Sequence, residues 1–257
     1  MGPPKTAGAA ARRVRLRAMA TRPQLLDKNA NSVRQMFAGV APRYDFLNHL
    51  LSLSQDKRWR RLSARALGVG PGALVLDLCC GTGDQALAVQ RHGARVVASD
   101  FCLPMLAIAE RKYEALNGGR PAGLAGDSLV LPFGGSIFDG ATVSFGLRNV
   151  ADLDRGLEEI HRVLRPGGTV AFLEFAVPTA APLRWLYLLY FRRLLPLIGR
   201  MISSSDSAYT YLPESVLEFP QRRGFVDRMA AAGFEDSGWR DLSAGIVCLY
   251  TGRRGGE

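Results

Sequence analysis

The segment from Val75 to Asp100 constrains the fold of this chain more than any other. It contains a short apolar run, Leu74–Leu78, that is closed by glycines at 81 and 83, and a second apolar run at Arg95–Asp100. Short apolar runs of this kind are typical of parallel strands that are buried on both faces. A glycine turn after such a strand lets the backbone approach a ligand, because no Cβ intervenes. The segment therefore predicts a strand, a ligand-binding turn, a helix and a second strand.

The same alternation of strands and helices continues along the chain. We expect further strands at 123–126, 138–145 and 169–177, and helices at 87–92, 105–116 and 153–164, the last of these stopped by Pro166-Gly167-Gly168. This order is typical of a doubly wound α/β fold. Near the end of the chain, strands at 234–242 and 245–251 follow a helix at 225–232, with a turn too short for a parallel crossover. The pattern predicts a Rossmann-like, seven-stranded sheet of the class I methyltransferase type, with an antiparallel last strand.

The first thirty residues differ in composition from the rest of the chain. Between Met1 and Leu26 there is no acidic residue, and six basic residues there account for more than half of the net charge of +10. We expect residues 1–30 to form a disordered basic tail, or a transit peptide, and residues 31–257 to form a single domain that opens with helices over 31–67. Because the charge is concentrated in the tail, the high isoelectric point is weak evidence for nucleic-acid binding, and we predict none.

The charges around the glycine turn indicate which cofactor it binds. Asp77 precedes the turn, Gly81 and Gly83 lie within it, and Asp84 follows it. Two carboxylates repel the pyrophosphate of a dinucleotide, whereas they attract the ammonium and sulfonium groups of S-adenosylmethionine. The turn therefore favours S-adenosyl-L-methionine over a nicotinamide cofactor.

Three later positions fit the adenosine part of such a cofactor. Asp100 ends the second strand, 19 residues beyond Gly81, where an acid accepts hydrogen bonds from the ribose hydroxyls. Asp127 follows the third strand and can accept from the adenine amino group, with the backbone amide of Ser128 beside it; the alternative role of Asp127 is a turn cap. Phe101 and Leu103 are expected to sandwich the base.

The cysteines and histidines predict no metal site. The four cysteines form no CxxC pair, and the three histidines stand alone in the sequence. This pattern suits neither a disulfide framework nor zinc ligation. We therefore expect a reduced, cytoplasmic, metal-free protein.

Three motifs resemble the signatures of the menaquinone and ubiquinone biosynthesis C-methyltransferase family. They are Phe145-Gly146-Leu147-Arg148-Asn149-Val150, Tyr44-Asp45-Phe46-Leu47-Asn48 with Leu51-Ser52 after it, and Arg162-Val163-Leu164-Arg165-Pro166-Gly167-Gly168. The resemblance runs from about Val33 to Arg253. It implies C-methylation of a prenylated quinol: a demethylmenaquinol, or alternatively the benzoquinol precursor of ubiquinone, or both, with the menaquinone branch the closer match.

The resemblance also implies which residues contact S-adenosylmethionine. By motif these are Thr82, Asp100, Asp127, Ser128 and Ser144. The chain departs from the family after the fifth strand, where Glu-Phe-Ser is common and Ala176 replaces the serine. The departure removes one candidate polar contact.

Methylation of an aromatic carbon needs an electron-rich ring, which a quinol supplies when one hydroxyl is ionised. The enzyme must stabilise that phenolate and exclude water. Arg148, just past the fourth strand, is the candidate for the phenolate, with a salt bridge as its alternative role. Asn149 is expected to orient a quinol oxygen or to cap the next helix, and Tyr44 to close over the ring and relay a proton.

The region near 178–222 is expected to be a substrate lid. Its apolar, aromatic stretch from Leu183 to Ile202 is interrupted by arginines and a proline, so it does not predict a membrane span. A buried core helix and a lid that touches the membrane surface both fit the stretch, and we favour peripheral contact at the inner face of the membrane. A homodimer is compatible with the sequence.

Two other functions remain open at this point. A nicotinamide-dependent oxidoreductase fits the sheet and Asp100, but fits poorly with Asp77 and Asp84. A non-catalytic subunit that binds S-adenosylmethionine is the other alternative, although the intact motifs favour an active enzyme.

Overall fold

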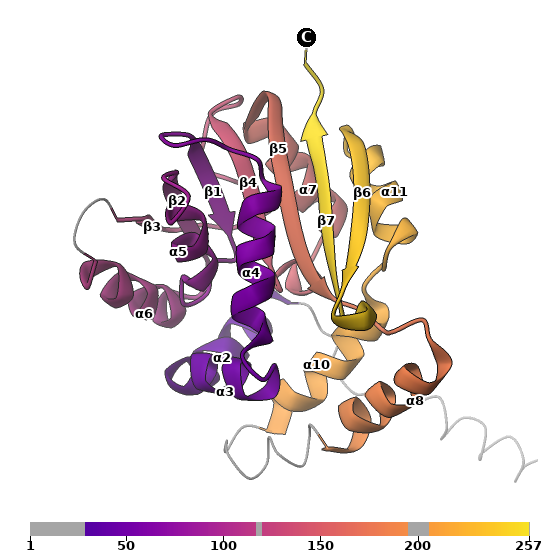
Figure 1. Ribbon diagram of the computed structural model, residues 1–257. Helices are drawn as coiled ribbons and strands as arrows, with labels where there is room; N and C mark the ends of the chain where they lie inside the picture. The colour runs from indigo at the N-terminus through magenta and orange to yellow at the C-terminus, as the bar shows by residue number, and fades with distance from the viewer. Residues whose placement is uncertain (1–28, 117–119, 195–205, 257) are drawn as a thin grey trace, which may run out of the picture.

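The computed structural model describes residues 29–116, 120–194 and 206–256 (Figure 1). The basic tail predicted over 1–30 lies, apart from its last two residues, outside the described residues, and so does the part of the predicted lid between 195 and 205. At the first described residue, the Asn29 side chain accepts a hydrogen bond from the Asn31 backbone N–H at 3.0 Å and caps the first described helix.

Seven strands of the described chain form one sheet in the order β3-β2-β1-β4-β5-β7-β6. Their bounds are β1 Leu74–Leu78, β2 Arg95–Asp100, β3 Ala122–Ala125, β4 Phe138–Ser144, β5 Leu164–Phe175, β6 Phe234–Leu242 and β7 Val247–Arg254. The strands from β3 to β5 pair in parallel, and β7 lies antiparallel to both β5 and β6. The predicted fold class is confirmed. The last strand lies inside the sheet, and β6 forms the edge.

The fifth strand begins earlier than its apolar pattern predicts. β5 starts at Leu164, which pairs with Phe138, and the next regular pair joins Thr169 to Gly140. The four residues between Leu164 and Thr169 therefore bulge out of the ladder, with Gly167 at a φ of +77°. The Pro166-Gly167-Gly168 turn lies within the strand rather than before it.

Helices cover both faces of the sheet (Figure 1). The described helices are α2 Ala30–Val40, α3 Tyr44–Leu51, α4 Gln55–Ala66, α5 Asp84–Gln90, α6 Leu103–Glu114, α7 Leu153–Val163, α8 Ala181–Leu189, α10 Asp206–Glu218 and α11 Arg223–Ala231, with short 3-10 turns at Ala41–Arg43, Leu147–Asn149 and Ser243–Gly245 and a π-helical turn at Tyr190–Leu194. The helices predicted over 31–67 are separated in two places. The expected interruption at Pro42 is confirmed as a 3-10 turn over Ala41–Arg43, and Leu53 and Ser54 adopt positive φ before α4.

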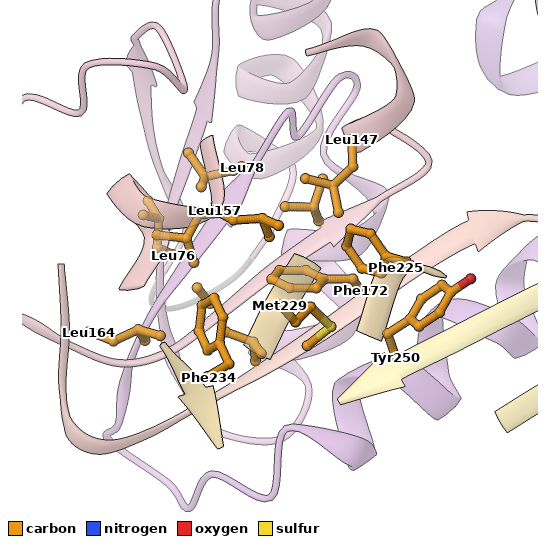
Figure 2. Packing of buried hydrophobic residues seen from close by; sticks show 14 of the residues in the cluster. Leu76, Leu78, Leu147, Leu157, Leu164, Phe172, Phe225, Met229, Phe234 and Tyr250 are labelled. Carbon is orange, nitrogen blue, oxygen red and sulfur yellow. The ribbon is translucent and has the colours of Figure 1, made fainter. Parts of the chain in front are cut away.

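The alternation of side chains along the strands divides the core into two clusters. Leu76 and Leu78 of β1 point toward α7 and α11, where they pack with Phe172 and Phe225 (Figure 2). Val75 points the other way and packs with residues of α4, α5 and α6. Asp77 has the same parity as Val75, so β1 carries it onto the face that α4 and α5 cover.

Helices α2, α3, α8 and α10 lie together beyond the carboxyl ends of the parallel strands (Figure 1). A small cluster of buried residues joins α3 to the lid helices: Leu47 from α3, Tyr187 from α8, Phe191 after it and Val216 from α10. The predicted lid over 178–222 thus contributes α8 and α10 to this end of the molecule. No helix in the described parts of the chain combines the length and the apolar character needed to cross a bilayer.

Candidate functional site

A pocket lies at the carboxyl edge of the sheet, where β1, β2 and β4 end. It encloses about 720 Å³, including open space at its mouth. Its polar wall includes Gly81, Asp100, Asp127, Ser128 and Ser144. Ligands of open α/β sheets bind at this edge, where the strand order reverses, and here the reversal falls between β1 and β4. We call this the cofactor pocket.

Asp100 is held rigidly in the cofactor pocket by the backbone. Its Oδ2 accepts the Gly81 N–H and its Oδ1 accepts the Cys102 N–H, each at 2.8 Å. Burial raises the pKa of Asp100, and these N–H groups partly oppose the rise. Each carboxylate oxygen has a second lone pair, so both oxygens remain able to accept a diol.

The residues predicted for the base also line this pocket, with one exception. Phe101, Asp127 and Ser128 lie in the wall, and Asp127 also caps a local turn by accepting the Leu129 N–H at 2.9 Å. The prediction for Leu103 is wrong: its side chain is 60% exposed at the start of α6 and outside the lining. Met105, one half-turn further along the helix, points inward in its place.

The polar atoms at the far side of the pocket fit a ligand. Ser144 Oγ and Asn149 Oδ1 are buried and have no hydrogen-bond partner, although such groups are nearly always satisfied. Gly146 lies beside them with no room for a side chain, since a Cβ there would stand 2.4 Å from the Cys79 Cβ. The wall therefore offers a diol acceptor, unsatisfied polar groups and close backbone approach, which together suit an adenosine cofactor with an amino-acid tail.

The glycine turn contributes less of the lining than its sequence suggests. Gly81 lines the cofactor pocket, whereas Thr82 and Gly83 do not. The Thr82 hydroxyl donates to Asp45 Oδ1 at 2.5 Å, which ties the turn to α3. Gly83 has a φ of +84° and lies against the Tyr113 ring, so its lack of a side chain serves packing as well as the turn.

Asp77 lies behind the pocket wall and outside its lining. Its side chain is fully buried, and neither carboxylate oxygen has a hydrogen-bond partner. Burial raises the pKa of Asp77 to about 8, although the positive charge of Arg60 opposes the rise. Asp77 therefore lies outside the cofactor pocket, because strand parity directs its side chain toward α4 and α5.

This burial predicts a pH dependence of stability. Between the ordinary carboxyl pKa of about 4 and the raised pKa of about 8, the folded protein binds more protons than the unfolded chain, so stability falls as pH rises. Asp77→Asn removes this slope. We expect the unfolding temperature of the variant to gain on the wild type from pH 5 to pH 8.5, by the equivalent of a few kcal/mol.

The matched control is Asp139→Asn, measured over the same pH range. The backbone N–H of Leu74 and the nearby Arg165 lower the pKa of Asp139, so its charge is constant above pH 5 and the variant should differ from the wild type by a fixed amount. A constant offset for Asp77→Asn as well would mean that Asp77 does not titrate in this window.

Asp84, the second acid expected to attract the cofactor, is engaged elsewhere. Lys112 Nζ lies 2.7 Å from Asp84 Oδ1 and 2.6 Å from Asp45 Oδ2. Burial alone would raise the pKa of Asp84, but Arg60 and Lys112 outweigh it and lower the pKa. Because Asp84 is already neutralised and lies outside the lining, the charge argument for the cofactor does not hold at this residue.

His49 does not stand alone, as the sequence suggested. Its Nδ1 lies 2.9 Å from Asp56 Oδ2, and its Nε2 lies 3.9 Å from Asp84. The ligand atoms of these three residues lie within 4.8 Å of one another. Lys112 on Asp84 supplies a positive charge at the same place, so the geometry is that of an ion-pair network joining α3, α4 and α5.

A second, more apolar cavity adjoins the cofactor pocket. It encloses about 1460 Å³, including open space at its mouth, and is formed by α2, α3, α4, α8 and α10. The two cavities share Phe37, Tyr44 and Phe145 in their linings. We call it the apolar cavity. Tyr44 therefore lies at the junction of the two cavities.

Arg148 faces the apolar cavity and forms a buried ion pair. Its Nη1 lies 3.0 Å from Glu174 Oε2 and donates to the Phe145 carbonyl at 2.5 Å, while its backbone N–H donates to Glu174 Oε1 at 3.3 Å. Its Nε is buried without a partner. The salt bridge considered for Arg148 is thus present, and the guanidinium also lies beside a cavity.

Two arginines flank a pair of stacked rings in this wall. Phe145 and Phe175 stack with centroids 4.6 Å apart; Arg60 lies 5.4 Å from the first centroid and Arg148 5.5 Å from the second. Cations over ring faces are attracted by the ring quadrupole. The stack fixes both guanidinium groups at the boundary of the apolar cavity.

Two other predictions are changed by the structure. Asn149 lines the cofactor pocket instead of the apolar cavity, and the following helix is capped by Asp152, whose side chain accepts the Arg155 N–H at 3.0 Å. Ala176 is fully buried in the core against α7 and α11, away from both linings. The serine that it replaces would therefore have no ligand to contact here.

Several site residues were missed by the sequence analysis. Glu174 lies in the Glu-Phe-Ala segment that ends with Ala176, and Tyr187 lies within the apolar stretch from Leu183 to Ile202. Tyr211 and Arg60 carried no signal, because they lie on helices whose relation to the pocket depends on tertiary packing. A buried acid in a strand, as at Glu174, was the one signal that could have been used, since such charges are nearly always paired.

The comparisons with known proteins agree with the fold and the motifs. The chain matches the ubiE/COQ5 methyltransferase family over residues 25–254. It is 43% identical to the demethylmenaquinone methyltransferase of Mycolicibacterium paratuberculosis, covering 89% of this chain and 96% of the relative, and 44% identical to that of Streptomyces avermitilis, covering 88% and 96%.

Solved structures share the fold at lower identity. A putative methyltransferase in complex with the Haloferax volcanii Trm112 activator has a TM-score of 0.62 at 17% identity, covering 85% of this chain and 97% of that one. Haemonchus contortus phosphoethanolamine N-methyltransferase 2, solved with S-adenosyl-L-methionine, has a TM-score of 0.53 at 16% identity, covering 73% and 50%. With the family matched over nearly its whole length, this chain belongs to the ubiE/COQ5 methyltransferase family.

Proposed function

We propose that the protein transfers the methyl group of S-adenosylmethionine to a ring carbon of a demethylmenaquinol, giving a menaquinol. The observation that carries the proposal is the junction of the two cavities: a polar pocket at the carboxyl edge of the sheet opens, past Tyr44 and Phe145, on a large apolar cavity. The relatives at 43–44% identity are named for this reaction. An apolar cavity of this size suits a bicyclic ring and the start of an isoprenoid tail.

Within this proposal, the polar pocket holds S-adenosylmethionine, which supplies an electrophilic methyl group. Asp100 accepts the ribose hydroxyls, while Asp127, the Ser128 amide and Phe101 hold the base. Ser144 and Asn149, whose side-chain oxygens are buried without partners, contact the amino-acid part. Thr82 and Gly83 shape the turn, and Asp77 lies behind the pocket wall.

The ring carbon beside an ionised hydroxyl attacks the methyl carbon, the sulfur–methyl bond breaks with its electron pair going to sulfur, and the ring carbon then loses its proton. The products are the methylated quinol, S-adenosylhomocysteine and one proton. Arg148 stabilises the phenolate charge from the apolar cavity, and the cavity's rings exclude water. Tyr44 closes over the quinol ring at the junction and relays a proton.

The direct test is methyl transfer to a short-chain demethylmenaquinol, with a demethoxybenzoquinol assayed beside it under reducing conditions. We expect methylation of the naphthoquinol. Transfer to the benzoquinol alone would mean that the substrate is the benzoquinol precursor of ubiquinone. Absence of transfer to both, with S-adenosylmethionine binding intact in calorimetry, would leave a non-catalytic binding protein.

Tyr44→Phe tests the junction. Because Tyr44 lines both cavities, loss of its hydroxyl is expected to lower kcat by about 10- to 100-fold. Affinity for S-adenosylmethionine should stay within about twofold, since the ring remains. An unchanged kcat would remove Tyr44 from the mechanism.

We further propose that the end of the protein that holds the apolar cavity contacts the inner face of the cytoplasmic membrane. A prenylated quinol would enter the cavity from that membrane. Large apolar side chains are exposed there on α3 and α8, with Phe46 at 62% and Trp185 at 68% exposure, and Arg184 and Arg193 are exposed beside them. Exposed apolar groups edged by basic residues bind anionic bilayers. Co-sedimentation with anionic vesicles at low salt supports this proposal, and its complete absence contradicts it.

A further inference from the structure

The apolar cavity is lined by two tyrosine side chains whose hydroxyl groups form no hydrogen bond. Tyr187 from α8 and Tyr211 from α10 both line it, at 6% and 5% exposure. Neither hydroxyl oxygen has a hydrogen-bond partner, and both are cut off from solvent. A buried hydroxyl without a partner carries a desolvation cost that phenylalanine in its place would avoid.

Both hydroxyls belong to side chains that line the same cavity as the Arg148 guanidinium. Burial raises the pKa of each phenol, and for each the positive charge of Arg148 is the first factor that opposes the rise. For Tyr211 the charge of Glu174, the partner of Arg148, acts as well. The 3-10 turn that carries Arg148 also packs against α10. Two lid helices thus each bring a hydroxyl to the cavity that Arg148 also lines.

The Arg148 side chain also has an unpaired hydrogen-bond donor. Its Nη1 serves Glu174 and the Phe145 carbonyl, but its Nε is buried and unpaired. Three residues that line one cavity therefore each have a buried donor without an acceptor: one N–H and two O–H groups. A ligand that satisfies them must bring an oxygen rich in lone pairs, on a body that is otherwise apolar.

We propose that Tyr187 and Tyr211 are substrate-binding residues that donate hydrogen bonds to the quinol oxygen beside Arg148. This inference rests on the proposed function, whose substrate is an aromatic ring bearing hydroxyl groups. The oxygen gains negative charge as the ring is activated, and an anionic oxygen accepts stronger hydrogen bonds than a neutral one. The lid thus completes the oxygen site when it covers the ring.

The test compares Tyr187→Phe, Tyr211→Phe and the double variant with the wild type, using a short-chain demethylmenaquinol. Each single change is expected to raise KM for the quinol or lower kcat so that kcat/KM falls about 5- to 10-fold, and the double change should lower it further. The Kd for S-adenosylmethionine should stay within about twofold. Thermal stability should be unchanged or higher, since each variant removes an unsatisfied buried hydroxyl.

Tyr250→Phe is the matched control, because its hydroxyl is buried but satisfied. It accepts the backbone N–H of Arg222 at 2.8 Å in the core. Its loss should lower stability while kcat/KM stays constant, the opposite of the result expected for the lid tyrosines. Unchanged kcat/KM in the double lid variant, with an active wild type, overturns the proposal.

A binding measurement separates this proposal from the proposed function. Titration of the wild type and the double variant with 1,4-naphthalenediol by calorimetry reports the oxygen site without any methyl transfer. Weaker binding in the double variant supports the tyrosine pair even if the wild type methylates neither quinol. Equal binding by both proteins overturns it, whatever the reaction is.

Discussion

Glu174→Ala is expected to lower the free energy of unfolding by about 3–5 kcal/mol, because it leaves the Arg148 guanidinium buried without its counter-charge. Glu174 is fully buried, and it accepts from both the guanidinium and the backbone N–H of Arg148. For a chain of this size the loss corresponds to roughly 10 °C in the unfolding temperature. Thermal unfolding followed by circular dichroism measures it.

Activity should fall in the same variant, because Glu174 also fixes the orientation of Arg148. The double variant Arg148→Met/Glu174→Met separates the two effects. Replacement of a whole buried ion pair by apolar side chains is commonly neutral or stabilising, so its unfolding temperature should recover toward the wild type. Its methyl transfer should stay low, since no guanidinium faces the quinol. Recovery of activity along with stability would limit Arg148 to a structural role.

Gly146→Ala is the second change with a large expected effect. Its φ of −111° allows alanine, so the effect is purely steric: the new Cβ would stand 2.4 Å from the Cys79 Cβ and 3.1 Å from Val143 Cγ1. Overpacking of this kind costs about 1–3 kcal/mol. Since Gly146 and Cys79 both line the cofactor pocket, we also expect affinity for S-adenosylmethionine to fall by about tenfold or more, measured by calorimetry.

A second substitution in the opposing residue checks the cause. Cys79 has a φ of +50°, which glycine adopts more readily, so Cys79→Gly removes the clashing atom and relieves backbone strain. The double variant should regain most of the lost stability, a coupling that a double-mutant cycle reports. Gly39→Ala is the control for glycine replacement alone: its Cβ meets nothing within 4 Å in α2, and it should be slightly stabilising. Additive effects at 79 and 146 would contradict the steric account.

The sheet was largely predictable, because its central strands carry an unambiguous pattern. β1 and β2 have the bounds that their apolar runs predicted, and the short turn before β7 correctly indicated antiparallel pairing. β5 was predicted too short because Leu164 pairs with β4 ahead of a bulge. A proline followed by two glycines predicts a turn from sequence. The same residues fit a turn before a strand and a bulge within it, so the sequence does not distinguish the two.

The cofactor pocket was predictable where the backbone alone places a residue. Asp100 and Ser144 lie at strand ends, so the sheet brings them to one edge. The predictions for Leu103, Asp77 and Asp84 depended on side-chain direction and on a partner far away in sequence, Lys112 in the case of Asp84. Neither can be read from local spacing.

The apolar cavity could not be predicted residue by residue. Its walls come from α2, α3 and α4 near the start of the described chain and from α8 and α10 more than a hundred residues later, and one of its buried ion pairs joins residues 148 and 174. The helical pattern shows which face of each helix is apolar, but it does not show which faces meet. Tyr187 was therefore indistinguishable from its apolar neighbours, although its hydroxyl is what sets it apart.

The place of β7 has a consequence for how the chain is made. β7 is the last described strand to leave the ribosome, yet it lies between β5 and β6 and supplies Tyr250 to the core. Until it emerges, one side of β5 and the whole of β6 lack their pairing partner, and a strand edge of this kind invites association with other chains. The sheet is therefore completed by a strand that is made after both of its neighbours, and nascent chains are most prone to aggregate just before β7 emerges.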